Sequence, residues 1–139
     1  NPFSTRPWQH VIEPLSGYLR LAERLFSDRS KYSTSYNFGP YINSNKTVQK
    51  LVEESLKVWP GKFNIANNDK VPHEAKMLYL VIDKAIKELD WEPYWDFTNT
   101  IQKTIIWYKK VLMGGESALD CSLNDLNSYT KIKKIANEN

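Results

Sequence analysis

The first candidates for chemistry lie in the stretch RPWQHVIEP at residues 6–14. Arg6 carries a planar guanidinium that can bind a phosphate through two parallel hydrogen bonds, and Trp8 offers a flat ring for stacking or packing. Gln9 and His10 add neutral polar groups directly before the start of a predicted helix. These residue types predict an anion-binding site. The alternative is a structural role, in which Arg6 pairs with an acid and Trp8 fills the core.

A second candidate is the polar loop at residues 67–77, which contains His73 and Glu74 directly after a proline. Loops that a rigid scaffold holds in place often carry recognition groups. The same composition is also typical of an ordinary surface loop. The residues alone therefore leave both interpretations open.

Several common active-site patterns are missing from the sequence. The five glycines do not form a glycine-rich phosphate loop, and neither histidine has a partner at metal-binding spacing. Tyr129 and Lys133 have the spacing of a proton-transfer pair, but they lie in the last predicted helix, beyond every predicted strand. We interpret this pair as a coincidence. The sequence thus predicts no catalytic residue, cofactor site or metal site within the chain.

Length and composition predict one soluble domain. The 139 residues are enough for one core and too few for two ordinary domains, and the 41% hydrophobic and 25% charged shares are typical of globular proteins. The net charge of +3 is dispersed, except for KIKK at 131–134, so neither nucleic acid nor a membrane is expected as a partner. A lone cysteine, Cys121, and the lack of a signal peptide predict a cytoplasmic location.

The elements that must position these groups are mainly helices. Apolar residues recur at three- and four-residue steps, which predicts helices at 14–28, 44–59, 83–91, 96–113 and 122–134. Ser44, Asn45 and Thr47 are candidate caps for the second helix, Asp83 and Asp96 are expected to cap the next two, and Ser122 with Asp125 forms a possible capping box for the last.

Short strands are predicted between these helices. The stretches at 35–40, 62–68 and 76–82 are rich in β-prone residues or alternate apolar with polar residues, although 76–82 could equally open the helix that follows it. The combination indicates a helix-rich α/β fold whose sheet of short strands is incomplete.

Four stretches of the sequence resemble a known enzyme family. They read RPWQHVIEPLSGYLRLAERL, YNFGP, PHEAKMLYLVIDKAIKELDWEPYWDFTNTIQKTIIWYK and CSLNDLNSY. In this order they are similar to the C-terminal portion of the CDP-glucose 4,6-dehydratases, a family of extended short-chain dehydrogenase/reductases. The RPWQHV phrase is the most specific part of the resemblance, whereas the pattern from Asp83 to Pro93 recurs in nucleotide-sugar epimerases and dehydratases generally.

The resemblance implies that residues 1–139 form a single domain, the substrate-binding part of a Rossmann-type enzyme. An N-terminal domain absent from this chain would bind NAD and carry the catalytic groups. The parent would convert CDP-D-glucose to CDP-4-keto-6-deoxy-D-glucose and water, for deoxysugar and lipopolysaccharide O-antigen synthesis. The chain alone would be inactive. The lack of an initiator methionine before Asn1 also suggests a piece of a longer protein.

The resemblance also implies roles for individual residues. Arg6 would contact the diphosphate of a CDP-sugar, with Trp8 and Gln9 nearby, and His73 and Glu74 would lie where relatives contact the diphosphate or the ribose. Many relatives carry an arginine near that loop, where this chain offers only lysines, Lys70 and Lys76. The identity of the second phosphate contact is therefore open, while His10 and Glu13 are expected to be structural.

Two other functions remain open on the sequence. The chain could belong to a related enzyme that acts on a UDP-, dTDP- or GDP-sugar, or it could be a noncatalytic helical interaction domain. The parent is expected to be a homodimer. Without its neighbours, this chain is expected to self-associate and cover the apolar faces around Leu19, Phe26 and Phe38.

Overall fold

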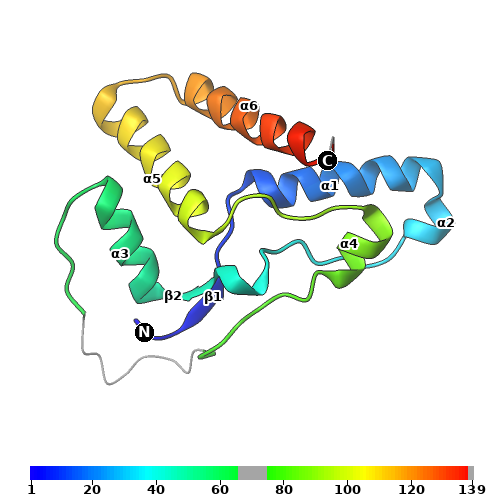
Figure 1. Ribbon diagram of the computed structural model, residues 1–139, viewed down its shortest axis with the longest axis horizontal. Helices are drawn as coiled ribbons and strands as arrows, with labels where there is room; N and C mark the ends of the chain where they lie inside the picture. Colours follow the sequence, from blue (N-terminus) through cyan, green and yellow to red (C-terminus); the bar gives the residue numbers. More distant parts are fainter. Residues whose placement is uncertain (66–74, 138–139) are drawn as a thin grey trace.

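The computed structural model describes residues 1–65 and 75–137. Most of the regular structure is helical, and two short strands lie side by side in the lower part of the view (Figure 1). The elements are β1 (Thr5–Pro7), α1 (Ile12–Ser27), α2 (Arg29–Tyr32), the 3-10 helix η1 (Ile42–Ser44), β2 (Asn45–Thr47), α3 (Val48–Val58), α4 (Asp83–Leu89), α5 (Phe97–Gly114) and α6 (Ala118–Asn137). No helix in the described ranges is both long and apolar enough to span a membrane.

The five predicted helices are confirmed, together with most of their end signals. The Thr47 hydroxyl accepts a hydrogen bond from the Lys50 amide at 3.1 Å and begins α3. The Asp96 carboxylate accepts one from the Asn99 amide at 2.8 Å and begins α5. Gly115, with a φ of 67°, ends α5 in the left-handed conformation that glycine adopts without strain.

Ser44 and Asn45 lie before the α3 cap, in η1 and β2, and the caps predicted for α4 and α6 are wrong. The last helix begins earlier than expected, because the Ser117 hydroxyl accepts a hydrogen bond from the Asp120 amide at 3.3 Å. Ser122 therefore lies inside α6 and donates to the Ala118 carbonyl at 2.8 Å instead of forming a capping box. Asp83 is the first residue of α4 rather than its cap, a position where its charge favours the helix dipole.

The sheet is short and incomplete, as predicted, but its strands are not the predicted ones. Strands β1 and β2 are antiparallel, with Thr5 opposite Thr47, Arg6 opposite Lys46 and Pro7 opposite Asn45. The other edge of β1 contacts residues 76–78, where the Thr5 amide donates to the Lys76 carbonyl at 2.9 Å and the Leu78 amide donates to the Thr5 carbonyl at 3.3 Å. We call β1, β2 and residues 76–78 the β1 platform.

The strands predicted at 35–40, 62–68 and 76–82 are wrong within the described residues. Residues 35–40 form no strand in the described part of the chain, and the Phe38 side chain is buried in the core. Phe63 and Ile65 are 46% and 55% exposed, so the alternation around them has no surface to pack against. Of residues 76–82, only Met77 forms a bridge, and residues 66–68 lie outside the described part.

The core forms where α1, α4 and the extended residues after α2 meet. Its buried side chains are Tyr32, Phe38, Ile82, Ala85, Leu89 and Trp91. The Phe38 ring sits so close to α1 that a Cβ at Gly17 would lie 2.3 Å from its Cδ1 atom, which explains the glycine there. The expectation that Phe38 belongs to an exposed face is therefore wrong.

A buried carboxylate joins three parts of the chain. Glu13 in α1 is fully buried, and its Oε1 atom accepts hydrogen bonds from the amides of Tyr94 at 3.0 Å and Trp95 at 2.7 Å. Its Oε2 atom accepts one from the Tyr129 hydroxyl of α6 at 2.8 Å. Burial raises the pKa of Glu13, and these hydrogen bonds act in the opposite direction. The structural role expected for Glu13 agrees with this geometry.

We expect Glu13→Ala to lower the free energy of unfolding by about 3 kcal/mol or more, because it leaves buried donors without an acceptor. Tyr129→Phe removes only one donor and should cost about 1–2 kcal/mol. Urea unfolding measures both. Glu23→Ala, at an exposed position of the same helix, is the control and should change stability far less than either substitution. Equal stability of the Glu13 and Glu23 variants would contradict the role assigned to Glu13.

Candidate anion site and adjoining groove

Arg6 lies at the centre of the β1 platform. Its Nη1 atom donates to two carbonyl oxygens, that of Thr5 at 2.7 Å and that of Ala75 at 3.0 Å. Both acceptors are backbone carbonyl oxygens, and these two bonds orient the guanidinium. The platform thus holds the Arg6 side chain in a fixed direction in the middle of a short strand.

Trp8 is fixed beside Arg6. Its indole Nε1 atom donates to the Lys46 carbonyl of β2 at 2.9 Å, and its amide donates to the Arg6 carbonyl at 3.1 Å. The side chain is half-buried and does not belong to the central core. Trp8 therefore contributes a rigid aromatic surface next to the strand that carries Arg6.

Of the other predicted site residues, Gln9 is described by the structure, whereas the two loop residues are not. The Gln9 amide group donates to the Phe38 carbonyl at 2.9 Å, while its Oε1 atom is buried without a hydrogen-bond partner in the described part of the chain. His73 and Glu74 lie outside the described residues. Ala75, the next residue along, contacts Arg6 as given above, so the structure brings the described flank of that loop to the candidate site.

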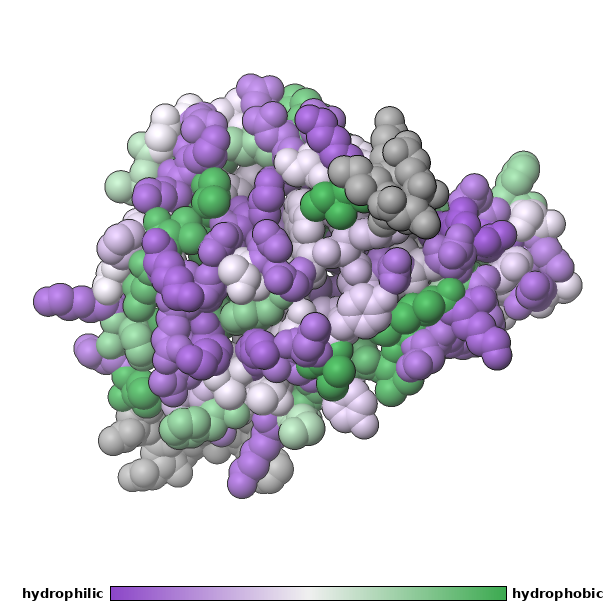
Figure 2. Space-filling view, viewed as in Figure 1, coloured by the Kyte–Doolittle hydropathy of each residue, from purple (hydrophilic) through white to green (hydrophobic). Residues whose placement is uncertain are grey.

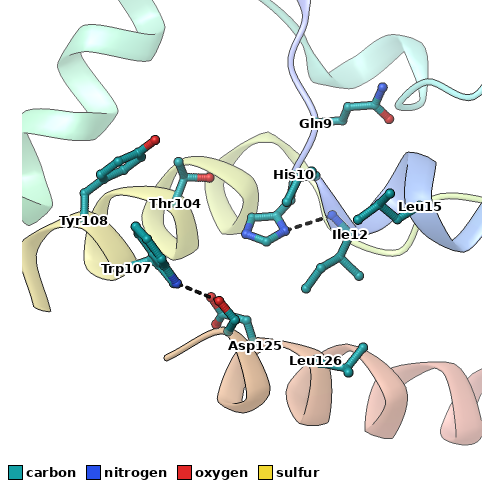
Figure 3. Close-up of a pocket in the computed structure, with 11 residues that line it drawn as sticks. Gln9, His10, Ile12, Leu15, Thr104, Trp107, Tyr108, Asp125 and Leu126 are labelled. Carbon is teal, nitrogen blue, oxygen red and sulfur yellow. Dashed lines mark hydrogen bonds between the residues drawn. The ribbon is translucent and has the colours of Figure 1, made fainter. Parts of the chain in front are cut away.

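A groove of about 630 Å³ adjoins Gln9, between the start of α1 and the helices α5 and α6 (Figure 3). Most of its lining is apolar or aromatic: Val11, Ile12, Leu15, Trp107, Tyr108 and Leu126. Its polar lining residues are Gln9, His10, Thr104, Ser122 and Asp125. Sequence reasoning did not assign Trp107 and Tyr108 to any site, because only the packing of α5 against α1 and α6 brings them next to Gln9.

His10 faces this groove from the entrance of α1 (Figure 3). It is 7% exposed, its Nδ1 atom accepts a hydrogen bond from the Ile12 amide at 3.3 Å, and its ring meets the Trp95 ring edge-on at 4.8 Å. Burial lowers the pKa of His10, while Asp125 acts to raise it and Lys103 to lower it. His10 is therefore a neutral side chain that fixes the helix entrance, in agreement with the expected structural role.

The groove is unsuited to an anion. Asp125 is the charged residue of its described lining, and it pairs with Lys103 at 3.1 Å. Trp107 adds an indole donor, but this donor is already bound to the Ser122 hydroxyl at 3.1 Å. A phosphate would find its cations on the β1 platform rather than here. The described residues also contain no group of three or more His, Cys, Asp or Glu side chains that could hold a metal ion.

No protein-family model matches the chain. Among curated proteins, it is similar to CDP-glucose 4,6-dehydratase of Salmonella typhimurium, with 39% identity over 130 residues that cover 93% of this chain and 36% of the relative. It is also similar to UDP-glucose 4-epimerase of Rhizobium meliloti, with 26% identity over 110 residues, or 79% of this chain and 32% of that protein. The chain thus spans about a third of the length of these relatives. The first match lies in a C-terminal part of the dehydratase, and the resemblance noted in the sequence is confirmed.

The buried His10 generates a prediction about pH. Its folded pKa lies below its ordinary value of 6.5, so the unfolded chain binds the proton more tightly. Stability should therefore fall as the pH drops below about 6.5, with a slope of at most about 1.4 kcal/mol per pH unit for this one group. Urea unfolding at several pH values measures the slope.

The two histidines of the chain allow a matched control. The slope attributed to His10 should disappear in His10→Gln and persist in His73→Gln. A slope that survives in His10→Gln would show that another group causes it.

Proposed function

We propose that this chain, a homologue of the C-terminal part of CDP-glucose 4,6-dehydratase, is the substrate-binding part of a nucleotide-sugar 4,6-dehydratase that acts on CDP-glucose. The similarity to a dehydratase and, more distantly, to an epimerase supports the nucleotide-sugar dehydratase and epimerase family. The finer assignment to CDP-glucose follows the more similar of the two relatives. We further propose a place in deoxysugar synthesis for lipopolysaccharide, in the cytoplasm.

The observation that carries this proposal is the fixed guanidinium of Arg6. Two backbone carbonyls orient it at 2.7 and 3.0 Å, and Trp8 is held beside it by the Lys46 carbonyl. A diphosphate is the part of a sugar nucleotide that a planar guanidinium recognises best, through two parallel hydrogen bonds. Arg6 would bind the diphosphate. Trp8 would limit the positions that the nucleoside or the sugar attached to this diphosphate can take.

The chemical steps require groups that this chain does not supply. NAD would be the hydride acceptor and donor of the parent enzyme, but the chain has no glycine-rich turn that would fit it. Tyr129 does not replace the missing proton-transfer tyrosine, because its hydroxyl is bound to the Glu13 carboxylate and burial raises its pKa. The role proposed for these residues is to bind and orient the substrate, and the chain alone should be inactive.

The epimerase relative favours a second candidate, a substrate-binding part that takes a UDP-sugar. The two candidates differ in the base that the site prefers. Thermal unfolding in the presence of CDP, UDP, dTDP or GDP separates them, because the preferred nucleotide stabilises the folded chain most.

Replacing Arg6 tests the proposed function directly. We expect Arg6→Ala to weaken CDP binding by about tenfold or more, since a charge-assisted phosphate contact is worth about 1.5–3 kcal/mol. Arg29→Ala removes the same charge from an exposed position of α2 and should leave the affinity unchanged. Isothermal titration calorimetry measures both. If the wild-type chain bound no nucleoside diphosphate, the function would be a noncatalytic one.

We also propose that this chain associates with itself. Leu19 and Phe26 on α1 are 74% and 96% exposed, and hydrophobic residues interrupt the hydrophilic surface on the face drawn in Figure 2. Uncovered apolar side chains of this size favour association, because each buries apolar area that water otherwise surrounds.

Replacing both apolar residues with aspartate should therefore shift the chain toward the monomer. We expect the Leu19→Asp, Phe26→Asp variant to sediment as a smaller species than the wild-type chain at the same concentration. Ser27→Asp introduces a single negative charge at an exposed position of the same helix without removing apolar surface, and it should not change the sedimentation. A wild-type chain that is monomeric at every concentration would contradict self-association.

A further inference from the structure

Residues 75–78 form one side of the candidate anion site. The carbonyl contacts of Arg6, with Thr5 and Ala75, hold its guanidinium at the edge of β1 that faces this segment. The direction of the guanidinium therefore depends on where residues 75–78 lie relative to β1. The side chains of this segment are exposed, so hydrogen bonds rather than burial of these side chains must hold it in place.

The backbone ladder between β1 and this segment is interrupted at Pro7. The Thr5 amide donates to the Lys76 carbonyl and the Leu78 amide donates to the Thr5 carbonyl, which is the pattern of a parallel pair. In this pattern the next donor is the amide of residue 7, and its acceptor is the Leu78 carbonyl. Residue 7 is a proline, which has no N–H. The backbone alone therefore cannot continue the ladder.

The side chain of Asn45 supplies the missing donor. Asn45 lies opposite Pro7 in the antiparallel pair of β1 and β2. Its Nδ2 atom donates to the Leu78 carbonyl at 3.1 Å, which is the acceptor that an amide of residue 7 would have used. Strand β2 is itself fixed, because the Trp8 indole donates to the Lys46 carbonyl at 2.9 Å. Asn45 thus links all three parts of the β1 platform.

We propose that Asn45 is a positioning residue of the candidate anion site. By replacing the donor that Pro7 lacks, its side-chain amide keeps residues 75–78 beside β1, and this segment in turn keeps the Arg6 guanidinium in the direction that binds a diphosphate. This inference rests on the proposed function and adds to it a residue that does not touch the ligand. A site that is ordered before binding loses less entropy when the ligand arrives. Removal of the Asn45 amide should therefore weaken binding, although Arg6 itself remains.

The first test is isothermal titration calorimetry of the 139-residue chain with CDP. We expect Asn45→Ala to weaken CDP binding about threefold to tenfold, because residues 75–78 then have to be ordered when the ligand binds. Asn37→Ala is the matched control. The Asn37 amide donates to the Val81 carbonyl at 3.2 Å, so this variant breaks the same kind of bond to the stretch that follows residue 78. Both variants should lower the unfolding midpoint by similar amounts, but Asn37→Ala should bind CDP like the wild type.

Restoring the backbone donor should rescue the Asn45 variant. Pro7→Ala gives residue 7 an N–H that can donate to the Leu78 carbonyl, so the variant with both Pro7→Ala and Asn45→Ala should recover most of the CDP affinity. A side chain that only stabilised the fold would show no such dependence on residue 7. Hydrogen exchange followed by NMR gives a readout without ligand. The Leu78 amide should exchange faster in Asn45→Ala than in the wild type or in Asn37→Ala.

The outcomes separate this inference from the proposed function. If the wild type and Asn45→Ala bind CDP equally well, or if the double variant does not recover, the inference about Asn45 is wrong while the proposed function stands. An Asn45→Ala chain that is unfolded in the absence of ligand would also contradict the inference, because Asn45 would then be needed for the fold as a whole. If the wild type binds no CDP, both are wrong.

Discussion

The carboxylate of Glu13 ties together segments that are far apart in the sequence. It accepts hydrogen bonds from the amides of Tyr94 and Trp95 before α5 and from the Tyr129 hydroxyl in α6. A fully buried carboxylate is stable only when such donors surround it. The start of α1 is therefore fixed against the two C-terminal helices by one side chain. The segment that connects β1 to α1 therefore ends at Glu13, a residue that is fixed in place.

That constraint extends to the candidate anion site. The chain between Arg6 and Glu13 is short, and three contacts hold it: the Trp8 indole on the Lys46 carbonyl, the Gln9 amide on the Phe38 carbonyl and His10 on the Ile12 amide. An anion gains most from a cation that does not have to be ordered on binding. The buried network around Glu13 and the surface cation thus belong to one arrangement, in which the core supplies the rigidity that the site needs.

The sequence predicted the helices better than the strands, for physical reasons. A helix repeats its apolar positions over several turns and carries its own caps, as at Thr47 and Asp96. Strands β1 and β2 have three residues each, too few for an alternating pattern, and their partners come from distant parts of the chain. The capping box at Ser122 failed because Ser117 provides an earlier cap, and nothing in the local pattern ranks one serine above the other.

The candidate site, like the fold, could be predicted from the sequence only in part. Arg6 could be singled out by its residue type and by the resemblance, whereas its contact with the Ala75 carbonyl arises only because β1 lies beside residues 76–78. Arg6 would contact phosphate alone, and phosphates are the same in every nucleoside diphosphate. Such a contact provides affinity without choosing a base, so a preference for cytosine has to come from side chains that reach the edge of the base.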